Sequence, residues 1–390
     1  MLHRLRNIFK IEIDYSSRIF GFDVLRGFAI IIVLYTHGRT KLINFTAINQ
    51  FVSIIAFWTM DMFFVLSGYL IGTMLIKTYV RDADFTGKSA YNFWIRRWFR
   101  TLPNYYLLLF GTALLWLIID GNKILFRAQF LADLFFCQSI FSPPSFFLME
   151  SWSLCIEEWF YLLFPLCLIA GEWILSYTKL NNIDKIKYNI LACILFFYFI
   201  PLILRIHAYT LQPQLTWYDV SRMTFHRIDA VSIGITFAWI DYFYKGFLKK
   251  IRIILLFVFV ISFSVYIYYN YIVFGEGYNR LFPLSAYIYY YLLTAISAFS
   301  LCVYMKDFKI KQVNWFVVFI SYWSITSYSC YIFHRSVVMY LVDAVFKTHT
   351  PIQNIPLFLL YATGSILLSI IVYKYFEHPM TELREKWKIK

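Results

Sequence analysis

The feature that most constrains the fold of this chain is a series of apolar blocks, each about 20 residues long or longer. Hydrophobic residues make up 61% of the 390 residues, whereas soluble domains average roughly 45–50% apolar residues. Each block is long enough to cross the ~30 Å hydrocarbon core of a bilayer. A transmembrane β-barrel would instead show segments of about 10 residues with alternating polarity. The sequence therefore predicts an all-α polytopic membrane bundle.

We expect about ten membrane-spanning helices. The predicted spans are 22–40, 50–76, 101–119, 152–171, 188–204, 226–244, 253–272, 282–305, 315–345 and 353–373. They form one membrane domain over 1–390, with a cytoplasmic segment 1–21 and a cytoplasmic tail 374–390. We expect no cleavable signal sequence, no internal repeat of the kind common in transporters and no added soluble domain. Without an added soluble domain to take over a reacting group, the membrane domain is expected to complete its reaction by itself.

The charges of the chain indicate its orientation in the membrane. The net charge of +14 is compatible with a nucleic-acid partner, but the positions of the cations favour another explanation. Of the 36 Lys and Arg residues, 25 fall on the side of the N-terminus, 8 on the opposite side and 3 within spans. The positive-inside rule then places both termini in the cytoplasm. We therefore expect no nucleic-acid partner, and we expect the six cysteines to be buried thiols.

The first predicted span carries two ionisable residues, which are costly in lipid and commonly mark a functional site or an ion pair. Within FDVLRGFAIIIVLYTHG (22–38), Arg26 lies near the cytoplasmic end and His37 near the outer end. Their spacing of eleven residues corresponds to about 16 Å along a helix and about 20° around it. The two side chains therefore share one face of the helix.

Three other spans bring polar residues to the outer half of the membrane. Glu157 and Glu158 lie in the first turns of 152–171, Arg227 and Asp229 at the start of 226–244, and His334 beyond the midpoint of 315–345. We expect Glu157 to lie at a depth comparable to that of the histidine of the first span. A second polar group, on the cytoplasmic side, includes the RRWFR sequence at 96–100.

Each of these features also has a structural interpretation. His37 is as readily explained as a hydrogen-bonded histidine between packed helices. Arg227 and Asp229 are interpreted first as an ion pair with each other. For Arg97 we prefer the interpretation that it only sets the topology of the following span. The combined polar layer across four spans nevertheless favours a functional site.

Seven motifs resemble those of the acyltransferase family 3 membrane proteins, which O-acylate sugars of bacterial cell-surface glycans and some small molecules. They are Arg26-x10-His37, MDMFFVLSGYLIG (60–72), RRWFRTLPNYY (96–106), WSLCIEEWFYLLFPL (152–166), RIDAVSIG (227–234), YSCYIFHRSV (328–337) and YFEHPM (375–380). They occur in the usual order and cover nearly the whole chain. One departure is Thr59-Met60, where the family often has a glycine and a small residue. The resemblance implies a multi-pass protein of the bacterial cytoplasmic (inner) membrane that uses cytoplasmic acyl-CoA, usually acetyl-CoA.

The residues and the resemblance together suggest a division of roles. Arg26, Arg96 and Arg100 are candidates to bind the phosphates of the CoA donor, because arginine forks match phosphate geometry. His37 is the candidate general base for the acceptor hydroxyl, since the ordinary pKa of histidine is about 6.5. Glu157 either orients this histidine or binds the acceptor directly. The distance of about 16 Å along the first span is of the order of a pantetheine arm.

Further residues are candidates for acceptor binding or for stabilising the oxyanion of the thioester. They are Ser67, Asp61, Tyr69, Arg227, Asp229 and His334. Gly68 is expected to permit close approach of two helices. No metal is expected. We prefer direct transfer of the acyl group to the acceptor. A mechanism through an acyl-enzyme intermediate stays open as an alternative.

The acceptor implied by the resemblance is a sugar hydroxyl of an exported or surface polysaccharide, such as O-antigen or exopolysaccharide, or of its lipid-linked precursor. Two alternatives stay open. One is a transporter or exporter that uses the polar layer as a substrate path. The other is the same fold with succinyl-CoA as donor or with a non-glycan acceptor. The cytoplasmic arginines, together with His37 and Glu157, favour the enzyme.

Overall fold

The computed structural model describes residues 11–16, 18–42, 46–120, 128–140, 147–212, 215–274, 284–310, 312–346 and 354–389. Within these ranges the regular structure is entirely helical, as predicted. The helices of at least 15 residues among them are α2 (Phe20–Gly38), α3 (Thr46–Asp82), α4 (Gly87–Asp120), α6 (Trp152–Leu175), α7 (Asn182–Leu211), α10 (Asp229–Phe243), α12 (Arg252–Phe274), α13 (Leu284–Lys306), α14 (Trp315–Phe333) and α16 (Ile355–Val372).

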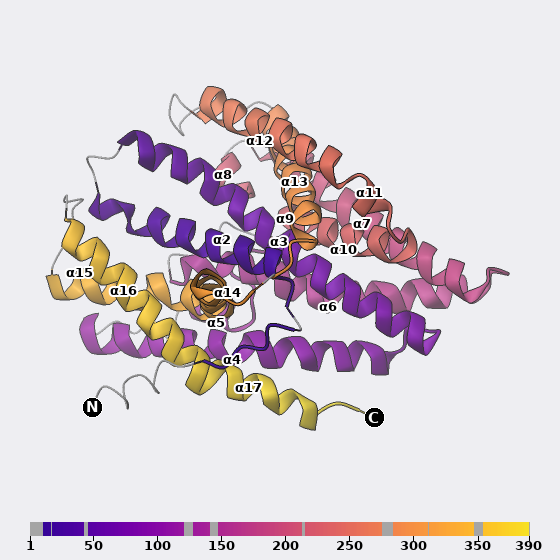
Figure 1. Cartoon of the computed structure of the whole chain (residues 1–390), viewed down its shortest axis with the longest axis horizontal. Coiled ribbons are helices and arrows are strands. Elements are labelled where there is room, and N and C mark those ends of the chain that lie inside the picture. Colours follow the sequence, from indigo (N-terminus) through magenta and orange to yellow (C-terminus); the bar gives the residue numbers. More distant parts are fainter. Residues whose placement is uncertain are drawn as a thin grey trace.

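Shorter elements connect and extend these helices. They are α5 (Ala128–Leu134), α8 (Trp217–Val220), α9 (Thr224–Arg227), α11 (Phe247–Lys250), α15 (Tyr340–Phe346), α17 (His378–Leu383), the 3-10 turns η1 (Arg39–Lys41), η3 (Met149–Ser151) and η6 (Arg384–Lys386), and the π-helical segments η4 (His334–Met339) and η5 (Tyr373–Glu377). Figure 1 shows α3, α4 and α6 running lengthwise through the molecule, with the α3–α4 and α6–α7 turns at one end. Helix α2 ends at the opposite end. This alternation agrees with the predicted topology.

Nine helices in the described part of the chain are long and apolar enough to cross a membrane, and they correspond to nine of the ten predicted spans. The sixth predicted span, 226–244, differs. Here the chain forms the short helix α9 and then α10, which has only 15 residues, fewer than the ~20 that a helix needs to cross a bilayer by itself. The apolar sequence of α10 is explained by burial against other helices, because most of its first ten residues are buried.

Helices α3 and α10 cross in backbone contact. A Cβ atom added to Gly68 of α3 would lie 2.1 Å from the carbonyl oxygen of Val231. A Cβ atom added to Gly234 of α10 would lie 2.2 Å from the carbonyl oxygen of Val65. Both distances are far below van der Waals contact, so only glycine permits this crossing. The expectation that Gly68 allows a close helix approach is confirmed.

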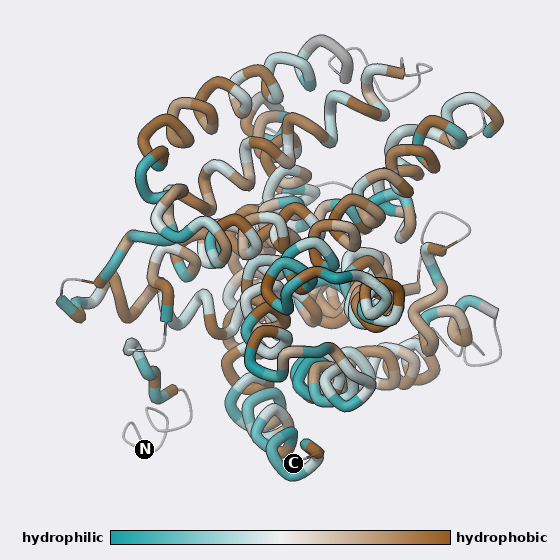
Figure 2. The backbone as a smooth tube through the Cα atoms, turned by 90° about the vertical axis from the view of Figure 1, so that its right-hand side faces the viewer, coloured by the Kyte–Doolittle hydropathy of each residue, from teal (hydrophilic) through white to brown (hydrophobic). Residues whose placement is uncertain are grey.

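The outer faces of several helices are apolar, as a lipid environment requires. On α12, Ile254, Phe257 and Ile261 are 61%, 64% and 64% exposed, and their spacing of three and four residues places them on one face. Figure 2 views the molecule from the end that carries the α3–α4 and α6–α7 turns, with hydrophilic segments where the chain turns and hydrophobic segments along the helices. The distribution is that of a multi-pass membrane protein.

Candidate functional site

An inner cavity of about 120 Å³ lies between α2, α3, α4, α6 and α14. Its polar lining includes Arg26, Ser67, Arg97, Arg100, Glu157 and Tyr161. Arg26 comes from the first half of α2, and Arg97 and Arg100 come from the first half of α4. Three guanidinium groups thus face one carboxylate of α6. The cavity is strongly cationic and suits an anionic ligand.

The structure places Arg97, and not Arg96, in this inner cavity. Successive residues of a helix point about 100° apart, whereas residues three apart share a face. Arg97 and Arg100 therefore point together, and Arg96 lines a separate cavity of about 380 Å³ with Arg81 and Lys88. The sequence analysis chose Arg96 and Arg100 and preferred a purely topological role for Arg97. The spacing of three residues was the signal that could have found it.

Glu157 lies on the wall of the inner cavity and contacts its neighbours there. The hydroxyl of Tyr161 donates a hydrogen bond to Glu157 Oε2 (2.8 Å) and lies 2.6 Å from Ser67 Oγ. The expected contact with His37 is absent from the described hydrogen bonds. Glu157 is five residues into α6, about 7.5 Å below the first residue of this helix, whereas Glu150 of η3 occupies the level of His37.

An outer cavity of about 630 Å³ lies at the opposite end of α2. Its lining includes one histidine, one carboxylate and three arginines, which are His37, Glu150, Arg39, Arg222 and Arg335. These residues come from segments that are far apart in the sequence and meet where α2 and η1, η3, the α8–α9 connection and η4 converge. Sequence reasoning missed Glu150, Arg222 and Arg335 as site residues. Glu150 and Arg222 lie between predicted spans, and Arg335 lies in the predicted span 315–345, where only the neighbouring His334 was chosen.

His37 forms a hydrogen bond with His334, with 2.7 Å between His37 Nδ1 and His334 Nε2. His334 Nδ1 lies 2.7 Å from the carbonyl oxygen of Tyr331, which can only accept a proton. When both rings are neutral, His334 Nδ1 therefore carries the proton and Nε2 accepts from His37 Nδ1. This arrangement leaves the lone pair on His37 Nε2, which has no hydrogen-bond partner among the described residues. His334 thus has the orienting position that was expected for Glu157.

The inner and outer cavities share two lining residues, Met60 of α3 and Tyr331 of α14. The hydroxyl of Tyr331 donates to the carbonyl oxygen of Glu150 (2.7 Å) and lies 2.7 Å from Ser153 Oγ. These contacts fix the ring at the junction. Met60 occupies the position at which the family often has a small residue. The two cavities therefore adjoin at Met60 and Tyr331, and we call this place the junction.

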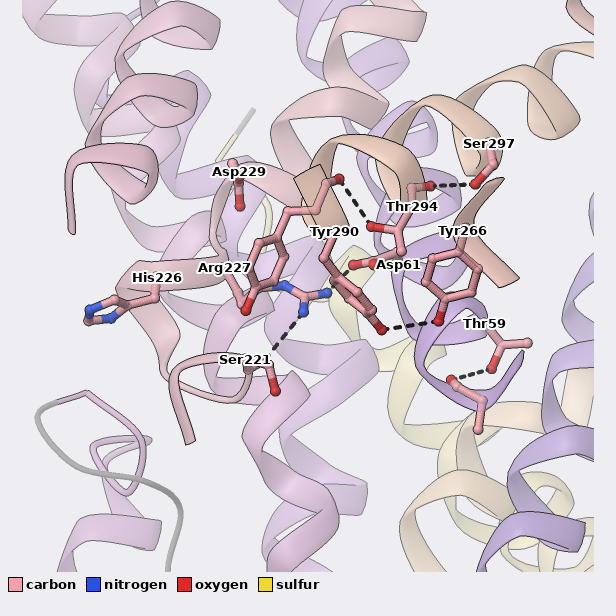
Figure 3. A network of polar contacts seen from close by, with 12 residues as sticks. Thr59, Asp61, Ser221, His226, Arg227, Asp229, Tyr266, Tyr290, Thr294 and Ser297 are labelled. Atoms are coloured by element: carbon pink, nitrogen blue, oxygen red, sulfur yellow. Dashed lines mark hydrogen bonds and ion pairs between the residues drawn. The ribbon is translucent and has the colours of Figure 1, made fainter. Parts of the chain in front are cut away.

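Asp61, Arg227 and Asp229 form a separate buried charge network, which Figure 3 shows. Arg227 pairs with Asp61, and these residues are 1% and 3% exposed. Asp229 pairs instead with Arg205 at 2.8 Å. The interpretation of Arg227 and Asp229 as partners is wrong, because residues two positions apart on a helical turn do not face each other. The guanidinium groups of Arg205 and Arg227 lie 4.4 and 4.7 Å from the centre of the Tyr291 ring.

This network lines neither the inner nor the outer cavity. The polar contacts of Arg227 to the described residues are the ion pair with Asp61 and a hydrogen bond to the Ser221 carbonyl oxygen (3.4 Å). Tyr69 also lies outside both cavities, with its hydroxyl donating to Asp241 Oδ2 (3.0 Å). The structure therefore gives these four candidates structural contacts. Ser67 lines the inner cavity, and His334 is buried behind the outer cavity, where it bonds to His37.

The fold and the cavities define a multi-pass membrane protein with two adjoining cavities that are lined in part by charged residues. The profile of a family described as an acyltransferase domain (Acyl_transf_3) matches residues 19–374, which is most of the chain. The chain belongs to this acyltransferase family. No solved structure matches it.

Several curated relatives are named as O-acetyltransferases. The chain is 34% identical over 169 residues to the putative peptidoglycan O-acetyltransferase YrhL of Bacillus subtilis (strain 168), which is 40% of this chain and 24% of YrhL. It is 35% identical over 163 residues to a putative O-acetyltransferase of Staphylococcus aureus (strain COL), 38% of this chain and 24% of that protein. Against the O-acetyltransferase OatA of S. aureus (strain NCTC 8325 / PS 47) it is 25% identical over 389 residues, 95% of this chain and 58% of OatA. The chain thus spans about a quarter to somewhat more than half of these relatives.

Proposed function

We propose that this chain is an O-acetyltransferase of the bacterial inner membrane that transfers an acetyl group from cytoplasmic acetyl-CoA to a glycan hydroxyl. The observation that carries the proposal is that the two cavities share Met60 and Tyr331, with Arg26, Arg97 and Arg100 in the inner cavity and His37 in the outer one. The charge bias of the loops puts the inner cavity on the cytoplasmic side. The donor thus enters from one end of the path and the acceptor from the other.

The inner cavity supports an anionic donor. Arg26, Arg97 and Arg100 outnumber Glu157, and Nε of Arg97 is buried without a hydrogen-bond partner in the described part of the chain. Uncompensated charge within a membrane protein is costly, and phosphate oxygens are acceptors that guanidinium groups match well. The phosphates of CoA would satisfy these donors.

We propose that Arg96 lies at the cytoplasmic entrance for the donor. The cavity that it lines also contains Arg81 and Lys88, but Asp82 and Asp84 offset part of their charge. This cavity lies one helical turn from the inner cavity along α3 and α4. We assign it the nucleotide end of CoA, with a weaker contribution to affinity than that of the inner arginines.

The chemistry needs a base at the acceptor hydroxyl. The hydroxyl oxygen attacks the thioester carbonyl carbon while His37 Nε2 accepts the hydroxyl proton. The carbon–sulfur bond then breaks, and the sulfur of CoA leaves as a thiolate that takes up a proton. His334 holds His37 with its lone pair free and is a positioning residue. Ser67 stays a candidate for the oxyanion, but Arg227 and Asp229 do not, since both are engaged in buried ion pairs.

The outer cavity supports a glycan acceptor. Its volume of about 630 Å³ and its aromatic residues Phe57, Trp152 and Tyr218 suit a sugar ring with flanking polar groups. The name of YrhL, a putative peptidoglycan O-acetyltransferase, is in line with an acceptor of this class. An exported polysaccharide or a lipid-linked precursor presents its hydroxyls on this side of the membrane.

The proposal is tested with the full chain in lipid nanodiscs, radiolabelled acetyl-CoA and a panel of glycans. Wild-type protein is expected to release CoA and label a glycan, whereas His37→Gln abolishes labelling and still binds acetyl-CoA. His226→Gln is the matched control, because His226 is a buried histidine whose Nδ1 has no hydrogen-bond partner among the described residues. Glycan movement without CoA release would establish the transporter alternative, and labelling by His37→Gln would refute the base.

A further inference from the structure

We propose that the outer cavity recognises an acceptor with an anionic group beside the hydroxyl that is acetylated. The inference rests on the proposed function, and it narrows the acceptor from any glycan to one that carries a carboxylate or a phosphate. It follows from the charges that line the cavity and from the contacts that these charges lack.

Cations outnumber anions on the wall of this cavity. Arg39, Arg222 and Arg335 line it together with one carboxylate, that of Glu150. Glu150 forms no ion pair within 4 Å with them among the described residues, and its Oε1 accepts hydrogen bonds from the hydroxyl and the backbone N–H (3.2 Å) of Ser336. The cavity therefore presents three guanidinium groups, of which only Arg222 has a carboxylate within 4.0 Å, that of Asp219.

Two of these arginines have no carboxylate within 4 Å among the described residues. Arg39 donates to the carbonyl oxygen of Asn49 at 3.4 Å, and Arg335 contacts the sulfur of Met149 at 3.1 Å. A long hydrogen bond and a thioether are weak partners for a guanidinium group. Most of their donors are therefore available to a ligand.

Arg222 is held in place and is only 9% exposed. Its guanidinium group stacks 3.7 Å from the centre of the Tyr218 ring, and its Nε donates to the Tyr218 carbonyl oxygen at 3.3 Å. The carboxylate of Asp219 is 4.0 Å away, and its Oδ2 accepts from the backbone and hydroxyl of Thr216. Stacking preorganises Arg222 without neutralising it.

Such an arrangement is costly without an anion. Partly buried charges are usually paired, and charge-assisted bidentate bonds to carboxylate or phosphate are the contacts for which the arginine fork is best suited. His37 lines the same cavity, and Arg335 directly follows His334 in the chain. An anion bound by these arginines would therefore hold a neighbouring hydroxyl close to the proposed base.

The anionic group has two possible sources, an acidic sugar or the diphosphate of a lipid carrier. We propose direct binding measurements on the full chain in nanodiscs with three probes. The probes are neutral chitotetraose, a tetrasaccharide that alternates N-acetylglucosamine with glucuronic acid, and N-acetylglucosamine linked to farnesyl diphosphate. At least one anionic probe is expected to bind about tenfold or more tightly than chitotetraose, a preference that increasing salt reduces.

Arg222→Gln and Arg335→Gln are expected to remove the preference and to leave the affinity for chitotetraose within about twofold. Arg222→Lys and Arg335→Lys keep the positive charge and are expected to retain part of the preference for the anionic probe. Arg252→Gln, at a half-exposed arginine on the opposite end of the bundle, is the control. Thermal unfolding of each variant verifies that it is folded.

Preference for the acidic tetrasaccharide identifies a carboxylate on the acceptor, and preference for the diphosphate alone identifies the lipid carrier. Equal affinity for all three probes overturns the inference, as does a preference that survives both glutamine variants. Because binding does not require acetyl transfer, the outcome is independent of the proposed function. A chain that binds the acidic probe but transfers no acetyl group would refute the function and leave the anion site standing.

Discussion

Replacement of His334 gives the sharpest test of the histidine pair. His334→Ala removes the 2.7 Å hydrogen bond to His37, so the imidazole of His37 loses its fixed tautomer and orientation. A hydrogen bond to a group that becomes charged contributes about 1.5–3 kcal/mol. At 1.36 kcal/mol for each factor of ten, kcat should fall by about 10- to 160-fold. Loss of His37 itself should cost more, about 10²–10⁴-fold.

The assay is steady-state acetyl transfer in nanodiscs, with kcat and KM for acetyl-CoA measured separately. The donor cavity does not contain His334, so KM for acetyl-CoA should change by less than about twofold, a split that a general loss of structure would not produce. His334→Gln keeps an acceptor for His37 Nδ1 and should recover part of kcat. The double variant His37→Ala with His334→Ala should lower kcat no more than His37→Ala by itself, since the two residues act as a unit.

Two results would refute this reasoning. If His334→Ala keeps the wild-type kcat, the pair has no part in orienting the base. If the fold-decreases in kcat of His37→Ala and His334→Ala multiply in the double variant, His334 acts on its own and not through His37. His226→Gln, which removes no described side-chain hydrogen bond, should keep kcat within about twofold and controls for the change of a buried histidine.

Three further predictions concern the junction, the donor site and the buried network. Met60→Ala should widen the junction and raise the use of longer acyl-CoA over acetyl-CoA by about fourfold for each added methylene. Met60→Leu is the volume-matched control. An unchanged chain-length profile would show that Met60 does not limit the length of the acyl chain. Arg97→Ala should raise KM for acetyl-CoA about tenfold or more, whereas Arg96→Ala should raise it by less than about threefold; the reverse order would contradict the assignment of the inner cavity. Asp61→Asn should lower the free energy of unfolding by about 3–5 kcal/mol, because it leaves the charge of Arg227 buried without its partner. Thermal or denaturant unfolding measures this loss, and an unfolding midpoint equal to that of the wild type would show that the pair is dispensable.

The sequence by itself determined the class of fold. Nine of the ten predicted spans are long apolar helices, since about 20 apolar residues are needed to cross a bilayer whatever the tertiary structure. The shared face of Arg26 and His37 follows from the 3.6-residue period of one helix and holds in α2. These properties are local, so they can be predicted from a single segment.

Only the tertiary structure decided which polar residues meet. His334 lies 297 positions from His37, and Arg227 finds Asp61 of another helix rather than the nearby Asp229. The depth of Glu157 depends on where η3 and α6 begin, and the outer arginines come from three separate segments, η1, the α8–α9 connection and η4. Charge pairing in a bundle depends on helix rotation and crossing, such as the glycine contact between α3 and α10. The physical reason is that a charge in a low-dielectric interior takes the partner that packing brings within reach, and packing is a property of the whole bundle.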